Sequence, residues 1–282
     1  MSLWPFATAP DVLSKALALS EALRAGPPAT PRPPSVSPYA VDFGILGVGV
    51  FALGATRTLV PGIFMDATAT RRAGAVVPIS EAPLAISVLI AIFGTNLGWL
   101  DGVYAWHLVP PELQLAPPAQ VNPGSLLSKP QSGTLGTCVL WGTNYGVLTA
   151  GHVGDSLASA YDAAGAYVGD VVFTRDPANH RQQTRADVAL ISLAPDVPRP
   201  PRTAGAATLT GPSAVEVRSS AGSTTTSVIG KTSWFHFPAY AADYEDLYLT
   251  AGAVTQVGDS GSAVFLAGST QVVGHVIGAS PG

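Results

Sequence analysis

The strongest constraint on the fold is the alternation of short β-rich runs with turn residues after residue 130. Examples of these runs are YGVLTA, DVALISL and SAVFLAG, which are bounded by residues such as Gly, Asp and Ser. Short strands at near-regular spacing are typical of antiparallel β-barrels and β-sandwiches. We therefore expect a mainly β protein in which residues 130–282 form an antiparallel β domain.

The N-terminal part of the sequence has a different residue composition. Alanine and leucine residues within 1–26 predict a short helix. Two proline-rich linkers, 27–38 and 109–129, flank an apolar accessory region at 39–108, and such linkers are extended and semi-rigid. The expected organisation is a smaller α+β N-terminal region followed by the β domain at 130–282.

Residues 84–100 form a strongly apolar tract of 17 residues without a charge. A helix that crosses a bilayer needs about 20 predominantly apolar residues, so the tract is short for a span. Its Ile and Val residues, its two glycines and Asn96 also suit a pair of buried strands. We expect a soluble accessory domain, with a membrane span as the alternative.

The N-terminus lacks the early positive charge of a secretory signal, so we expect a cytoplasmic protein, or a membrane-associated one if residues 84–100 span a membrane.

The composition narrows the classes of partner. Charged residues make up 11% of the chain, against about 25% in ordinary soluble domains, which indicates extensive burial, membrane contact or both. The formal net charge is −4 and the only basic cluster is Arg71-Arg72, so nucleic acid is a poor partner. The single cysteine, Cys138, excludes an intrachain disulfide and is expected to be a buried, inert thiol. We expect no metal and no cofactor.

Three polar residues stand at the ends of apolar runs. His152 ends one run, Asp187 opens another, and Ser260 lies in a glycine-framed turn before a third. Each of them alone is compatible with an ordinary turn or strand-end residue. The three together, in the order His, Asp, Ser and separated by 35 and 73 residues, are a much more specific signal.

The segments around these residues resemble the trypsin-like (chymotrypsin-fold) serine peptidases. The matching stretches are LTAGH at 148–152, ADVALI at 186–191 and GDSGS at 258–262. The resemblance covers roughly residues 130–282 and is closest to compact bacterial or viral members that lack disulfides. It implies two antiparallel six-stranded β-barrels and a serine endopeptidase that acts on a protein or peptide substrate.

The same resemblance implies a role for each residue. Ser260 is the nucleophile, His152 the general base and then acid, and Asp187 the residue that orients His152. A serine hydroxyl is a weak nucleophile until a base takes its proton, and a buried carboxylate fixes the tautomer of the imidazole. The backbone N–H groups of Gly258 and Ser260 are the expected oxyanion hole.

The resemblance also outlines a substrate pocket. Its expected residues are Val254, Thr255, Ile277, Gly278 and Ala279. No carboxylate lies at its base, so we expect an uncharged P1 side chain rather than Arg or Lys. Glutamate is a second option, because Thr255 matches a threonine of acid-specific members. His275 stands one residue early relative to the pocket histidine of glutamate-specific relatives. Because neighbouring strand residues face opposite ways, we expect His275 to point away from the substrate.

Two other functions stay open. One is a catalytically silent binding or scaffold module that keeps the fold, and the other is a membrane-anchored processing protease with residues 84–100 as the anchor. The terminal helix common in the family is missing after the last expected strand, so we expect the N-terminal region to pack against the protease domain. The remaining histidines, His107, His180 and His236, have no motif context and are expected at the surface or in the core.

Overall fold

The computed structural model describes residues 10–25, 45–53, 57–66, 102–108, 112–113, 125–127, 132–155, 158–162, 164–177, 186–197, 205–219, 221–237, 242–252, 254–256 and 258–279. Within these residues the chain is mainly β, which confirms the predicted class, and its one long helix is α1 (Pro10–Ala25). No helix in this part of the chain has both the length and the apolar character needed to cross a bilayer. The apolar tract 84–100, the linker 27–38 and His180 lie outside the described residues.

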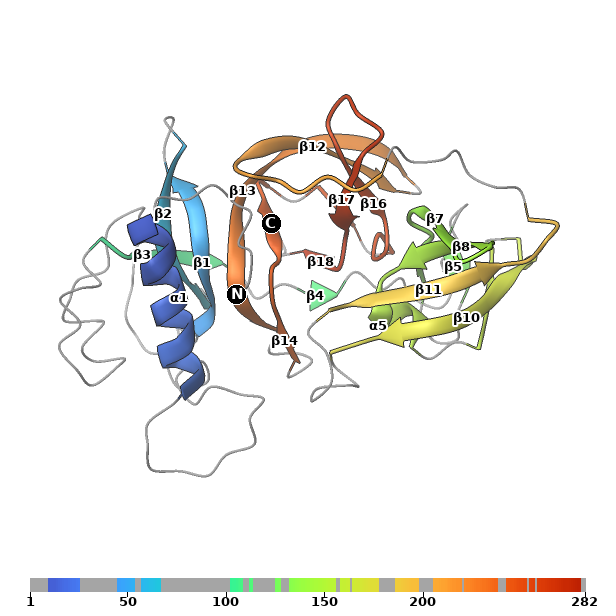
Figure 1. The fold of residues 1–282 in the computed structure, drawn as a ribbon, viewed down its shortest axis with the longest axis horizontal. Coiled ribbons are helices and arrows are strands. Elements are labelled where there is room, and N and C mark those ends of the chain that lie inside the picture. Colours follow the sequence, from blue (N-terminus) through green and yellow to red (C-terminus); the bar gives the residue numbers. More distant parts are fainter. Residues whose placement is uncertain are drawn as a thin grey trace.

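One of the two main sheets is built from the middle of the chain and is antiparallel throughout (Figure 1). In spatial order its strands are β7 (Cys138–Trp141), β8 (Asn144–Thr149), β11 (Val188–Leu193), β10 (Tyr167–Arg175) and β9 (Ser159–Tyr161). Its apolar core consists of small and branched side chains: Ala150, Val153, Ala160, Val168 and Ile191. Cys138 is partly buried at the sheet's edge strand rather than in this core.

The other main sheet joins the N-terminal region to the C-terminal end of the chain. Its path runs β17 (Val272–His275), β16 (Ala263–Leu266), β12 (Ser213–Ser219), β13 (Gly222–Phe237), β1 (Ile45–Leu53), β2 (Thr58–Asp66) and β3 (Tyr104–Leu108). Two further strands, β14 (Ala242–Tyr244) and β15 (Tyr248–Thr250), also pair with β13. Only β2 and β3 among these neighbours run parallel.

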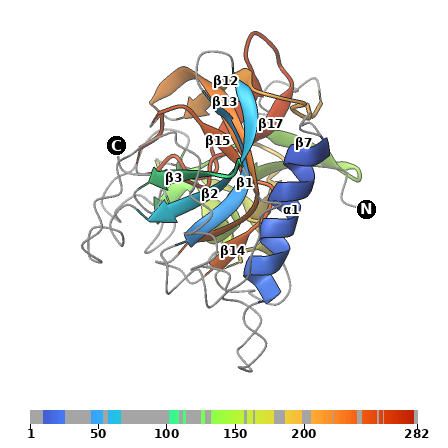
Figure 2. The ribbon, with the colours of Figure 1, turned by 90° about the vertical axis from the view of Figure 1, so that its left-hand side faces the viewer.

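The N-terminal strands enlarge one of the two sheets beyond the six strands expected for each barrel. The described residues form sheets of nine and five strands, because β1 pairs with β13 and brings β2 and β3 with it. Strands from both sides of the predicted linker at 109–129 therefore share one sheet, and α1 packs on β1 beside it (Figure 2). This is the contact with the C-terminal half that the sequence predicted.

Glycine makes the close contact between β1 and its neighbours possible. A Cβ added at Gly49 would overlap the carbonyl oxygen of Lys231 on β13, and one at Gly62 would overlap the ring of Phe51. The aromatic core of this sheet is shared between N-terminal and C-terminal strands, and its buried members are Leu46, Phe51, Phe64, Phe235, Phe237, Ala242 and Tyr244.

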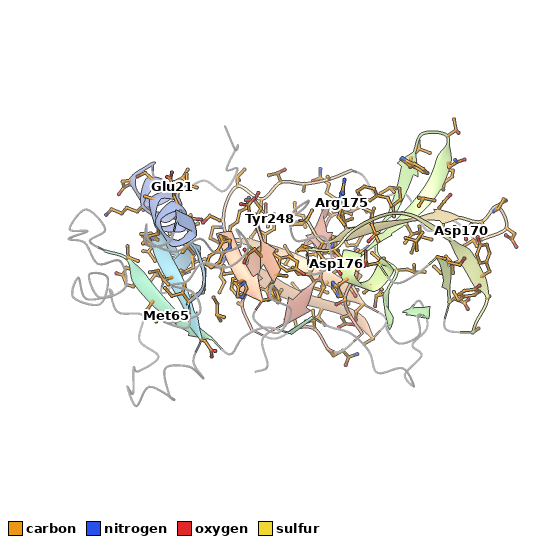
Figure 3. All side chains as sticks on the ribbon, turned by 90° about the horizontal axis from the view of Figure 1, so that it is seen from below. Glu21, Met65, Asp170, Arg175, Asp176 and Tyr248 are labelled. Atoms are coloured by element: carbon orange, nitrogen blue, oxygen red, sulfur yellow. The ribbon has the colours of Figure 1, made fainter. Side chains whose placement is uncertain are left out.

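Some of the shorter elements lie near the middle of the molecule. Seen from below, Met65 on β2 and Asp170 on β10 lie toward opposite ends of the long axis (Figure 3). Between the two main sheets lies the two-stranded pair of β4 (Glu112–Leu113) with β18 (Gly278–Ala279), and α5 (Gly151–Gly154) packs against β10 and β11 (Figure 1). Another pair joins β5 (Ser125–Leu127) to β6 (Ser132–Thr134). The candidate site is built in this central region.

Candidate active site

His152 lies in α5, a single helical turn that directly follows β8. The sequence analysis placed it at the end of an apolar run, and the structure shows that this run ends in a helical turn rather than in the strand itself. The backbone N–H groups of Val153 and Gly154 both donate to the carbonyl of Ala150 and close the turn. A Cβ on Gly151 would overlap the carbonyl oxygen of Arg175, so only glycine fits before the histidine. The turn holds the His152 side chain in a buried position.

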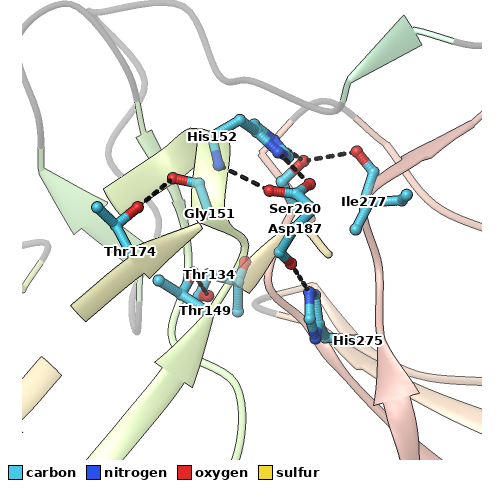
Figure 4. Close-up of polar contacts among 9 residues, drawn as sticks. All are labelled: Thr134, Thr149, Gly151, His152, Thr174, Asp187, Ser260, His275 and Ile277. Carbon is cyan, nitrogen blue, oxygen red and sulfur yellow. Dashed lines mark hydrogen bonds and ion pairs between the residues drawn. The ribbon is translucent and has the colours of Figure 1, made fainter. Parts of the chain in front are cut away.

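Asp187 precedes β11 and binds His152 through both carboxylate oxygens (Figure 4). Its Oδ1 accepts the backbone N–H of His152 at 2.8 Å, and its Oδ2 lies 2.6 Å from the ring Nδ1. The pairing of β11 with β8, with Ala189 opposite Thr149, brings these two residues together. Since a carboxylate only accepts hydrogen bonds, Nδ1 carries the proton and Nε2 is left with a lone pair.

Ser260 lies in a turn before β16, with its Oγ 2.9 Å from Nε2 of His152. The same Oγ lies 3.3 Å from the carbonyl oxygen of Ile277. Ser260 has 0% exposed surface, and the side chains of His152 and Asp187 are also buried. The structure thus brings the three residues singled out by the sequence into one relay, from carboxylate to imidazole to hydroxyl.

The turn that carries Ser260 presents backbone donors. Gly258 has a φ of +96°, which favours glycine. The Asp259 carboxylate accepts the backbone N–H of Gln256 at 2.9 Å and so holds the turn. The N–H groups of Gly258 and Ser260 donate to none of the residues that the structure describes. Two donors beside the nucleophile are the arrangement that an oxyanion requires.

Thr134 holds this turn through two hydrogen bonds, and no motif in the sequence pointed to this residue. Its backbone N–H donates to the carbonyl of Ser260 at 2.7 Å, and its hydroxyl donates to the carbonyl of Gly258 at 2.8 Å. Its own carbonyl accepts the hydroxyl of Thr149 at 2.9 Å. Every polar group of this buried side chain and backbone is therefore used to fix the turn against β6 and β8. Thr134 therefore holds the turn that carries Ser260 in place.

His275 lies behind Asp187, on the side opposite His152 (Figure 4). Its Nε2 donates to the backbone carbonyl of Asp187 at 2.5 Å. Burial lowers the pKa of His275 below 6.5, and the nearby His152 lowers it further, while Asp187 opposes part of this shift. His275 is therefore neutral with its proton on Nε2, and it holds the backbone carbonyl of Asp187. The sequence expected this side chain to face away from the substrate but did not predict its partner.

The expected pocket residues are only partly connected to the triad. Ile277 meets Ser260 through its carbonyl, and Gly278 and Ala279 follow at once as β18. Val254 and Thr255 lie partly exposed ahead of the catalytic turn, and their place at the base of a pocket stays a prediction. Of the other histidines, His236 is buried in the core, where Nδ1 lies 2.8 Å from Asp243.

Comparisons with known proteins find similarity at the level of structure alone. No family model and no curated protein matches the chain. A glutamic acid specific serine protease is 17% identical with a TM-score of 0.45, over 57% of this chain and 91% of that one. An alpha-lytic protease homolog is 19% identical with a TM-score of 0.44, over 56% and 85%. Protease A of Thermobifida fusca is 16% identical with a TM-score of 0.43, over 54% and 79%. These structures are bacterial serine proteases of the chymotrypsin fold, the family that the three motifs resemble.

Proposed function

We propose that this chain is a serine endopeptidase that hydrolyses protein or peptide substrates through Ser260, His152 and Asp187. The observation that carries the proposal is the continuous relay from Asp187 Oδ2 to Nδ1 at 2.6 Å and from Nε2 to Ser260 Oγ at 2.9 Å. A hydroxyl, an imidazole and a buried carboxylate in this order are the parts that nucleophilic acyl transfer needs.

The relay supports a two-step reaction. His152 takes the proton of Ser260 as Oγ attacks the substrate carbonyl, and Asp187 stabilises the imidazolium that forms. The N–H groups of Gly258 and Ser260 would bind the negative oxygen, an effect of about 3 kcal/mol per donor. His152 then gives the proton to the leaving amine, and a water molecule hydrolyses the acyl-enzyme by the same steps.

Covalent labelling with a fluorophosphonate tests the nucleophile. The wild type should be labelled on Ser260, and the Ser260→Ala variant should lose both labelling and turnover while remaining folded. Ser262→Ala is the matched control, because Ser262 is a buried serine of the same turn, two residues further on. Equal labelling of wild type and Ser260→Ala would contradict the assignment. A folded wild type without any labelling would favour the catalytically silent module.

For specificity, we propose an uncharged P1 residue. The residues assigned to the pocket, from Val254 and Thr255 to Ile277, carry no carboxylate, and a buried Arg or Lys without a partner costs several kcal/mol. A cleavage profile on a peptide library should show uncharged residues at P1. A preference for Arg or Lys would contradict the pocket, whereas a preference for glutamate would point to Thr255.

A further inference from the structure

The three candidate catalytic residues are carried by two different sheets. His152 and Asp187 belong to the five-stranded sheet, where α5 follows β8 and Asp187 precedes β11. Ser260 lies in the turn that leads into β16 of the nine-stranded sheet. A shift of one sheet against the other would therefore change the 2.9 Å distance between Nε2 of His152 and Oγ of Ser260.

The end of β17 is fixed to the turn that carries the nucleophile. His275 is the last residue of β17, which pairs with β16. The carbonyl of the next residue, Val276, accepts the backbone N–H of Gly261 at 2.8 Å, and the N–H of Val276 donates to the carbonyl of Ser262 at 2.9 Å. The backbone beside His275 therefore moves together with the turn of Ser260.

The His275 side chain reaches from this strand to the other sheet. Its Nε2 donates to the backbone carbonyl of Asp187 at 2.5 Å, on the side opposite His152 (Figure 4). Desolvation lowers the pKa of His275 below 6.5, so near neutral pH the ring is uncharged and its single N–H serves this carbonyl. Asp187 is thus held at two points, by its carboxylate on His152 and by its backbone on His275.

We propose that His275 positions the pair of His152 and Asp187 against the nucleophile, by holding the Asp187 backbone to the strand beside Ser260. This inference rests on the proposed serine endopeptidase function. The contacts form a closed ring, which runs from Ser260 through the relay to Asp187, from the Asp187 carbonyl to His275, and through the next residue back to the turn. In a closed ring of hydrogen bonds, a shift at one contact strains the others, so the whole arrangement is stiffened.

Loss of the His275 donor opens this ring at the Asp187 carbonyl. The carbonyl then needs another donor, and any movement of the Asp187 backbone also moves the carboxylate and the imidazole that it holds. A misplacement of about 1 Å can cost roughly 100-fold in rate, whereas neutralising the orienting carboxylate costs about 10⁴-fold. We therefore expect His275→Leu to lower kcat about 10- to 100-fold. KM should change little, because the side chain lies behind Asp187 and away from His152.

Two amide variants separate the hydrogen bond from the loss of packing. A glutamine amide nitrogen lies the same number of bonds from the backbone as Nε2 of histidine, whereas an asparagine amide is one bond shorter. His275→Gln should therefore restore most of kcat, and His275→Asn should behave like His275→Leu. His236→Gln is the matched control, because His236 is also a histidine of the nine-stranded sheet, bonded to Asp243 at 2.8 Å, and takes no part in the ring. It should alter stability without altering kcat.

Proton NMR reports the position of the relay without any turnover. The proton between Nδ1 of His152 and the Asp187 carboxylate, across 2.6 Å, should resonate far downfield, and its loss in Asp187→Asn assigns it. A second such proton, on His236, is identified by its loss in His236→Gln. The His152 resonance should shift upfield or broaden in His275→Leu and His275→Asn, and His275→Gln should retain it. Thermal melting of each variant establishes that it is folded.

The outcomes separate this inference from the proposed function. An enzyme that hydrolyses peptides, with kcat and the His152 resonance unchanged in His275→Leu, would overturn this inference alone. Equal losses in His275→Gln and His275→Asn would also overturn it, and this comparison decides the matter if His275→Leu does not fold. A wild type that neither takes up the fluorophosphonate nor hydrolyses peptides would overturn the proposed function, and the resonance in the His275 variants would then decide the positioning by itself.

Discussion

Replacing Thr134 with valine isolates the hydrogen bond that holds the turn of Gly258 and Ser260. The two side chains have nearly the same shape, and the Thr134 backbone N–H that donates to Ser260 is retained. Only the hydroxyl donor to the buried Gly258 carbonyl, at 2.8 Å, is lost. The variant therefore tests whether this one contact keeps the Gly258 N–H directed at the reacting carbonyl.

The expected loss follows from the desolvation of that carbonyl. A buried acceptor that loses its partner costs about 1–3 kcal/mol. If the Gly258–Asp259 peptide turns to recover a partner and the adjoining Gly258 N–H moves with it, up to the same free energy is lost from the transition state. This corresponds to a fall in kcat of about 5- to 150-fold, since each 1.36 kcal/mol is tenfold in rate. Most of this range lies below the roughly 10²–10³-fold effect of removing an oxyanion donor outright.

Steady-state kinetics and inhibitor binding separate positioning from general destabilisation. Thr134→Val should lower kcat with KM nearly unchanged, and should weaken binding of a peptide boronate that mimics the tetrahedral oxyanion by a similar factor. Thr134→Ser should restore most of both. Thr174→Val is the control, because the Thr174 hydroxyl makes a longer bond of 3.4 Å to the Gly151 carbonyl (Figure 4). Unchanged kcat and boronate affinity in Thr134→Val would refute the role of the hydroxyl.

Two further predictions concern stability. Burial lowers the pKa of His275 below 6.5, so the unfolded state takes up a proton first as the pH falls. The free energy of unfolding should therefore decrease below about pH 6.5, and less steeply in His275→Gln; equal slopes in urea titrations from pH 5 to 7 would count against this. Deleting residues 1–125 removes β1 from the edge of β13 and uncovers Phe235 and Phe237. The truncated domain should aggregate or melt at least several degrees lower, and a soluble, fully stable domain would disprove the packing.

The sequence singled out the three candidate catalytic residues and the turn of Ser260 because each lies in a short local motif. His152, Asp187 and Ser260 each stand within a stretch of five or six matching residues, and the structure brings them within hydrogen-bond distance. The mainly β class could be predicted equally well, since alternating strands and turns are a local pattern.

The hydrogen bonds that Thr134 and His275 make could not be predicted from the sequence in this way. Thr134 and His275 donate hydrogen bonds to backbone carbonyls 124 and 88 residues away in the chain. Every residue has a backbone carbonyl, so the sequence does not indicate which one accepts. The pairing of β1 with β13 has a bulge after Val48, and only the glycines of ILGVGVFAL hint at so close an approach. The helical turn of His152 spans four residues, too few for any periodicity to show.

β13 is 16 residues long, which is long enough to pair with strands from two different parts of the chain. β13 is paired by β12 over one part of its length and by β1 over another, and these partners come from opposite sides of the linker. The protein is therefore suited to division into two fragments that complement each other. Fragments 1–108 and 125–282, produced separately, should reassemble on mixing, with β1 adding to the open edge of β13. Recovery of labelling at Ser260 would then report that reassembly directly.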